Sequence, residues 1–126
     1  MQKSTTSTLE NWMNVPSGMQ VCIDNCTECY QMCSHLVDYC LKKGGEFSNP
    51  EHIKLLEDCA RICNLSADFM IRHSKFHDTV CDVCAKVCKA CAESCNALGK
   101  DDRILQACYD ACIKCAESCA QMAKGH

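Results

Sequence analysis

The sequence predicts an all-α protein, an antiparallel up-down-up-down four-helix bundle with a core lined by cysteine. Two observations predict this fold. Cysteine and apolar residues recur at alternating steps of three and four in four segments, which is the spacing of core positions on packed helices. Three short breaks separate these segments, and short connections join antiparallel neighbours. No alternating run of β-branched residues indicates a strand.

Start and stop signals give the expected bounds of each helix. Gly44 suits a left-handed C-terminal cap, while Asn49 and Pro50 suit the N-cap and first position of the next helix. Asp78 and Asp101 are the expected caps of the last two helices. The expected helices are 19–43, 50–73, 79–98 and 102–123.

Length and charge limit the function classes. A chain of 126 residues suits one domain, so we expect residues 1–18 to be a partly flexible or briefly helical extension and 19–126 to be the bundle. The net charge is -3, with both signs scattered along the chain. Because there is no basic block and no long apolar run, we expect no nucleic-acid partner and no membrane partner.

The cysteine content is the most informative feature of the composition. Sixteen of the 126 residues are cysteine, which exceeds the roughly 8–10% that marks a disulfide scaffold in secreted chains. Residues Met1 to Pro16 contain one Lys and lack an apolar stretch typical of an export signal. We therefore expect a cytoplasmic protein, in which thiols stay reduced and cysteine clusters more often bind metals.

All sixteen cysteines fall on the predicted core stripes and are the candidate metal ligands. They are Cys22, Cys26, Cys29, Cys33, Cys40, Cys59, Cys63, Cys81, Cys84, Cys88, Cys91, Cys95, Cys108, Cys112, Cys115 and Cys119. Most form pairs spaced i,i+4, whose Cβ atoms lie roughly 5–6 Å apart on one helix face. Thiolates favour Cu(I), Zn(II) and iron–sulfur clusters. Cu(I) accepts two or three sulfurs, so one helix can supply a site, whereas Zn(II) needs four ligands and would have to bridge helices.

The helix over 50–73 adds weaker candidates. Continuing its cysteine stripe outward gives His52 at one end and Met70 and His73 at the other, so these three are possible accessory donors. One end of the bundle should collect Leu36, Cys40, His52, Leu56, Leu98 and Leu105. The other should collect Cys22, Met70, His73, His77, Cys81, Cys119 and Met122. Donor chemistry alone favours metal entry at the second end.

Other readings of the cysteines stay open. They could pack as small apolar side chains, or staple the bundle through cross-helix disulfides. The chain could also be a thiol redox protein or sensor, with Cys22 or Cys81 near a helix start as the reactive thiol. No hydrolytic or phosphate-binding motif is present, so we expect no enzyme.

The run of C-x3-C and C-x2-C steps resembles the bacterial copper storage proteins of the cytosolic type. The similar segments are Cys22–Cys29, Cys81–Cys91 and Cys112–Cys119. The resemblance implies storage or detoxification of many Cu(I) ions per chain and assembly into homotetramers. It also implies metal entry near the first and third loops, in conflict with the donor chemistry. Leu36, Leu98 and Leu105 occupy that end, and at two of these positions cytosolic members often carry cysteine.

We expect the metal-free chain to be folded already, because neutral buried thiols and the Leu, Ile and Met positions can pack without an ion. Circular dichroism of the reduced, metal-free protein should show a helical spectrum. A spectrum that becomes helical only when metal is added would contradict this expectation.

Overall fold

The computed structural model describes residues 15–124 of the chain. In this range the α-helices are α2 (Ser17–Lys43), α3 (Pro50–Ile71), α4 (His77–Leu98) and α5 (Arg103–Lys124), and a short 3-10 helix, η1 (Gly45–Ser48), follows α2. The described part contains no strand. The all-α prediction is therefore confirmed. Most of the predicted N-terminal extension lies outside the described residues.

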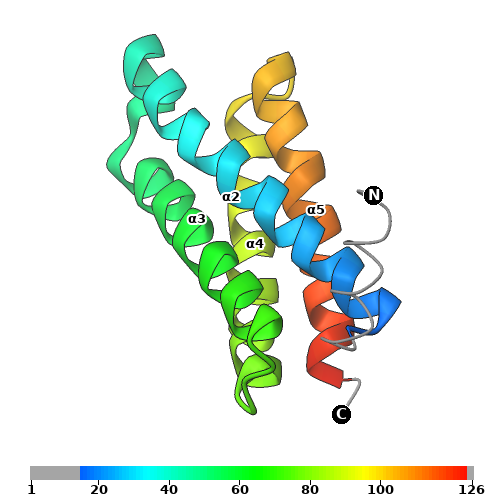
Figure 1. Ribbon diagram of the computed structural model, residues 1–126. Coiled ribbons are helices and arrows are strands. Elements are labelled where there is room, and N and C mark those ends of the chain that lie inside the picture. The colour runs from blue at the N-terminus through cyan, green and yellow to red at the C-terminus, as the bar shows by residue number, and fades with distance from the viewer. Residues whose placement is uncertain (1–14, 125–126) are drawn as a thin grey trace, which may run out of the picture.

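The four α-helices pack as an antiparallel bundle (Figure 1). Each contacts two neighbours, in the pairs α2 with α3, α3 with α4, α4 with α5, and α5 with α2. This is the cyclic order of an up-down-up-down bundle, in which short loops join sequential helices. No helix in the described range combines the length and apolar character needed to cross a bilayer.

The loop between α2 and α3 follows the sequence prediction. Gly44 ends α2 with φ +75°, a conformation that glycine adopts at little steric cost. The Asn49 side chain accepts a hydrogen bond of 2.8 Å from the backbone N–H of Glu51, and Pro50 is the first residue of α3. Asn49 therefore satisfies a backbone donor that the first turn of the helix leaves free.

The predicted starts of the last two helices are corrected by the structure. Helix α4 begins at His77, one residue before the expected cap Asp78, and Phe76 precedes it without a side-chain cap. For α5 the cap is Asp102 and not Asp101: its Oδ1 accepts hydrogen bonds from the N–H groups of Ile104 (2.9 Å) and Leu105 (3.0 Å).

A tertiary contact explains the choice of Asp102. Its Oδ2 accepts a 2.7 Å hydrogen bond from the Tyr39 hydroxyl and lies 3.3 Å from the Lys43 ammonium. These contacts fix the start of α5 against the end of α2. Local sequence alone does not distinguish two adjacent aspartates, because both are good capping residues.

The bundle core consists mainly of sulfur. All sixteen cysteines are fully buried, with an exposed fraction of 0%, and all are free thiols. The largest other buried side chains are Leu36, Leu56, Leu105 and Met70. Where most bundles place branched aliphatic side chains, this one therefore places cysteine.

Gly99 should not tolerate a larger residue. A Cβ at this position would lie 2.7 Å from the Cβ of Leu105, a contact that requires backbone movement. We expect Gly99→Ala to lower the free energy of unfolding by about 1–3 kcal/mol, the usual cost of overpacking. Urea unfolding of the metal-free protein measures this.

Gly18→Ala is the matched control, because the added Cβ would meet only the Met122 methyl group at 3.8 Å. It should be neutral or slightly stabilising, since alanine is the better helix former. Equal losses of stability in the two variants would contradict the packing argument for Gly99.

Candidate metal centre

Twelve of the sixteen thiols form one connected network across all four helices. Neighbouring Sγ atoms lie 3.4 Å apart between Cys63 and Cys88, and 3.7 Å apart between Cys29 and Cys59. The i,i+4 pairs predicted from sequence also meet, for example Cys115 and Cys119 at 4.0 Å. The thiols joined by such contacts are Cys22, Cys26, Cys29, Cys33, Cys59, Cys63, Cys84, Cys88, Cys108, Cys112, Cys115 and Cys119.

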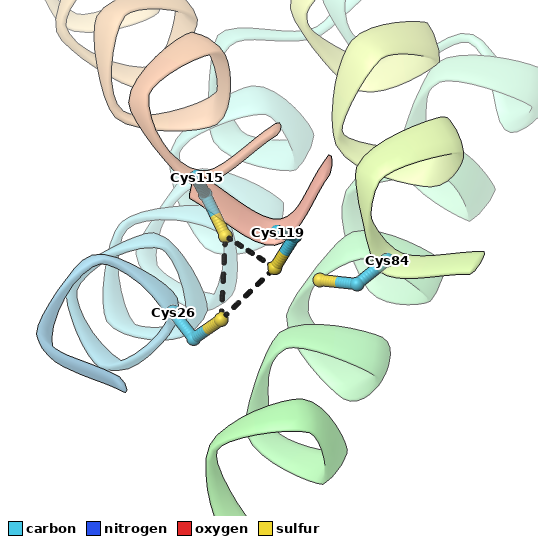
Figure 2. A group of neighbouring side chains, drawn as sticks. All are labelled: Cys26, Cys84, Cys115 and Cys119. Atoms are coloured by element: carbon cyan, nitrogen blue, oxygen red, sulfur yellow. Dashed lines mark hydrogen bonds between the residues drawn. The ribbon is translucent and has the colours of Figure 1, made fainter. Parts of the chain in front are cut away.

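Within this network, groups of four thiols surround points in the core. One group contains Cys26, Cys84, Cys115 and Cys119, whose sulfurs all lie within 4.8 Å of one another. Figure 2 shows the four side chains converging from α2, α4 and α5. The Cys26 sulfur lies 3.5 Å from those of both Cys115 and Cys119. Further groups share members with it or with one another: Cys29/Cys33/Cys59/Cys112, Cys29/Cys59/Cys63/Cys88, Cys33/Cys91/Cys108/Cys112 and Cys63/Cys84/Cys88/Cys115.

Charge favours Cu(I) over Zn(II) in this core. Four thiolates around a tetrahedral ion suit Zn(II), and the structure does bring four sulfurs from different helices together. Each such zinc site would, however, hold two net negative charges in a core that is closed to water. Monovalent copper at about one ion per thiolate leaves the core nearly neutral. Because neighbouring groups share sulfur atoms, one thiolate can bridge two bound ions.

Burial keeps the metal-free thiols protonated at the edge of the core. It raises the pKa of the Cys40 thiol to about 11. The pKa of Cys95 is also raised, by hydrogen bonds to Cys108 and Cys91 and then by burial. An incoming cation must therefore displace protons from these thiols.

Three buried leucines lie toward one end of the metal centre. Leu36, Leu56 and Leu105 come from three helices, and the exposed fraction of each is 1% or less. Leu36 takes the core position between Cys33 and Cys40 on α2, so it separates Cys40 from the thiols of the main network on that helix.

Past Leu36 on α2, Cys40 is paired with a histidine. The Cys40 Sγ lies 3.6 Å from Nε2 of His52, and the other ring nitrogen, Nδ1, lies 2.7 Å from the Ser94 hydroxyl. His52 is only 2% exposed, and burial lowers its pKa. Neutral imidazole is the form that ligates metals. His52 thus lies where it could act as a donor, held in orientation by Ser94.

The other two accessory candidates differ from each other. Met70 is fully buried in the core cluster, whereas His73 is exposed, just beyond the end of α3, with φ +57°. The structure therefore brings Met70, but not His73, to the core. Sequence reasoning missed Ser94, because a serine on an outer helix position carries no signal until its histidine partner is known.

The comparisons with known proteins agree with this geometry. The family described as copper storage protein matches residues 15–124, nearly the whole chain.

The chain belongs to the copper storage protein family.

Several solved structures are similar to this member of the family. A protein of Nitrosospira multiformis has 40% identity and a TM-score of 0.81, over 86% of this chain and 97% of its own. Csp3 of Bacillus subtilis in its Cu(I)-bound form has 34% identity and a TM-score of 0.78, over 85% and 99%. Ccsp of Streptomyces lividans, loaded with 10 copper equivalents, has 28% identity and a TM-score of 0.75, over 86% of both chains. No curated protein sequence matches the chain.

The different surroundings of Cys40 and Cys29 predict unequal effects of removing single thiols. Cys40 contacts one potential donor, His52, so Cys40→Ala should cost no more than about one bound Cu(I). Cys29 contacts Cys33, Cys59 and Cys112, so Cys29→Ala should cost more than one. Titration against a coloured Cu(I) chelator measures both capacities. Equal losses would show that Cys40 shares ions with the main network.

Proposed function

We propose that this protein binds and stores many Cu(I) ions as its cargo. The ions are held on its sixteen core cysteine thiolates. The observation that carries the proposal is the single network of buried thiols, whose neighbouring sulfurs lie 3.4–4.0 Å apart. The Cu(I)-bound state of Csp3 from Bacillus subtilis and the copper-loaded Ccsp from Streptomyces lividans support it.

Storage fits this core better than catalysis does. A reactive thiol needs access to its substrate and a surrounding that distinguishes it from its neighbours. The two redox candidates, Cys22 and Cys81, are as fully buried as the other fourteen cysteines. Because many equivalent ligands are closed off from water, the arrangement is suited to hold ions and not to turn over a substrate. We infer that the protein is not an enzyme.

The donor set is proposed to extend beyond sulfur at one place. His52 would complete a nitrogen–sulfur site with Cys40, with Ser94 fixing the ring. Such support from a hydrogen bond at the second ring nitrogen is usual for metal-binding histidines. Met70, buried in the core, is the proposed thioether donor, and the exposure of His73 makes it the weakest of the accessory candidates.

We also infer a homotetramer in the cytosol. A shallow, mainly apolar groove between α3 and α4 suits contact with another subunit; it is lined by Ile62, Leu65, Val83 and Val87 together with Asp58 and Arg61. A relative from Streptomyces lividans is described as a cytosolic copper storage protein. Sedimentation of the purified protein tests the tetramer.

The first test is an anaerobic Cu(I) titration of the reduced protein against a coloured chelator, beside a count of free thiols. Copper should leave the chelator until the bound ions approach the number of thiols, with protons released as thiolates form. Uptake that stops at one or two ions would end the storage proposal. Thiols that resist reduction would favour the disulfide reading instead.

A further inference from the structure

Ser66 lies in the sulfur core with an unsatisfied hydroxyl. It occupies the cysteine stripe of α3, one helical turn after Cys63 and one before Met70, and its exposed fraction is 0%. Within residues 15–124, its Oγ is the buried side-chain oxygen or nitrogen that has no hydrogen-bond partner. A buried hydroxyl without a partner destabilises a fold, so this one needs an explanation.

The register of the helices places Ser66 near the level of Cys84 and Cys119, two of the four thiols of Figure 2. Cys63 lies 3.4 Å from Cys88 and 3.7 Å from Cys84. Because α3 and α4 are antiparallel, one turn beyond Cys63 on α3 corresponds to the level of Cys84 on α4. Helices α3 and α5 run parallel, so the 3.6 Å contact of Cys63 with Cys115 places Cys119 on α5 one turn further along, at the level of Ser66.

We propose that Ser66 is a positioning residue for the metal, whose hydroxyl donates a hydrogen bond to a thiolate of the Cys26/Cys84/Cys115/Cys119 group once an ion has displaced the thiol proton. The proposal rests on the storage function. A protonated thiol is a weak acceptor, whereas an anionic sulfur is a strong one. The hydroxyl is thus without a partner in the metal-free protein and gains one on loading.

The Ser66 hydroxyl would act on the negative charge of thiolates that bound Cu(I) does not balance. While bound ions are fewer than thiolates, a Cu(I) held by two thiolates carries one net negative charge, and no solvent reaches the core to stabilise it. A hydroxyl dipole at this level offsets part of that charge. Cysteine at the same position would add another anion, and alanine would remove the donor.

Two simpler roles make different predictions. Serine in a helix can donate to the carbonyl four residues earlier, here Ile62, and would then stabilise the metal-free fold. Serine as an inert filler in place of cysteine would affect neither stability nor copper retention when truncated.

The test compares Ser66→Ala with Ser34→Ala, a change at an exposed serine on α2. Ser66→Ala should raise the melting temperature of the metal-free protein by about 2–5 °C, since it removes an unpartnered polar group. It should also weaken copper retention against the chelator by about three- to tenfold without changing the number of ions bound. Ser34→Ala should change neither quantity. Ser66→Cys should add up to about one bound ion.

The outcomes separate the two proposals. A lower or unchanged melting temperature for metal-free Ser66→Ala, or copper retention equal to that of the wild type, would overturn the role of Ser66 and leave storage intact. Wild-type protein that takes up only one or two ions would instead overturn the storage function.

Discussion

The burial of negative charge is the constraint on which this structure depends. Sixteen thiols fully removed from water can ionise only if a cation arrives for nearly every proton that leaves. This condition selects a monovalent soft ion over a divalent one that needs four thiolates. It also explains the closed bundle, because a core that admitted water would allow thiolates to form and oxidise without metal.

The helical repeat converts this constraint into a simple sequence rule. Steps of three and four residues bring each cysteine to the inner face, where i,i+4 partners such as Cys115 and Cys119 meet at 4.0 Å. Antiparallel packing then supplies partners from other helices, such as Cys26 at 3.5 Å from Cys115. Short loops are enough to connect the helices, because the core residues all come from helix faces. The few large apolar side chains lie at particular levels of the core.

Much of the fold could be predicted from the sequence, because it follows from periodicity and local capping. The burial of every cysteine and the cap at Asn49 are of this kind. Features set by contacts between distant residues could not be predicted. Asp102 caps α5 because it also meets Tyr39, and His52 is oriented because Ser94 lies across the bundle. The exposure of His73 follows from the helix ending at Ile71, two residues earlier than its stripe suggested.

The three buried leucines affect how fast copper leaves the protein rather than how many ions it binds. Leu36, Leu56 and Leu105 are buried on three helices, and Leu36 stands between Cys33 of the main thiol network and Cys40, which pairs with His52. These leucines can move aside for an ion only when side chains change rotamer or the helix ends fray. Copper that leaves by this end therefore waits on the breathing of the bundle, so release along this route can be slow even when a stronger ligand waits outside.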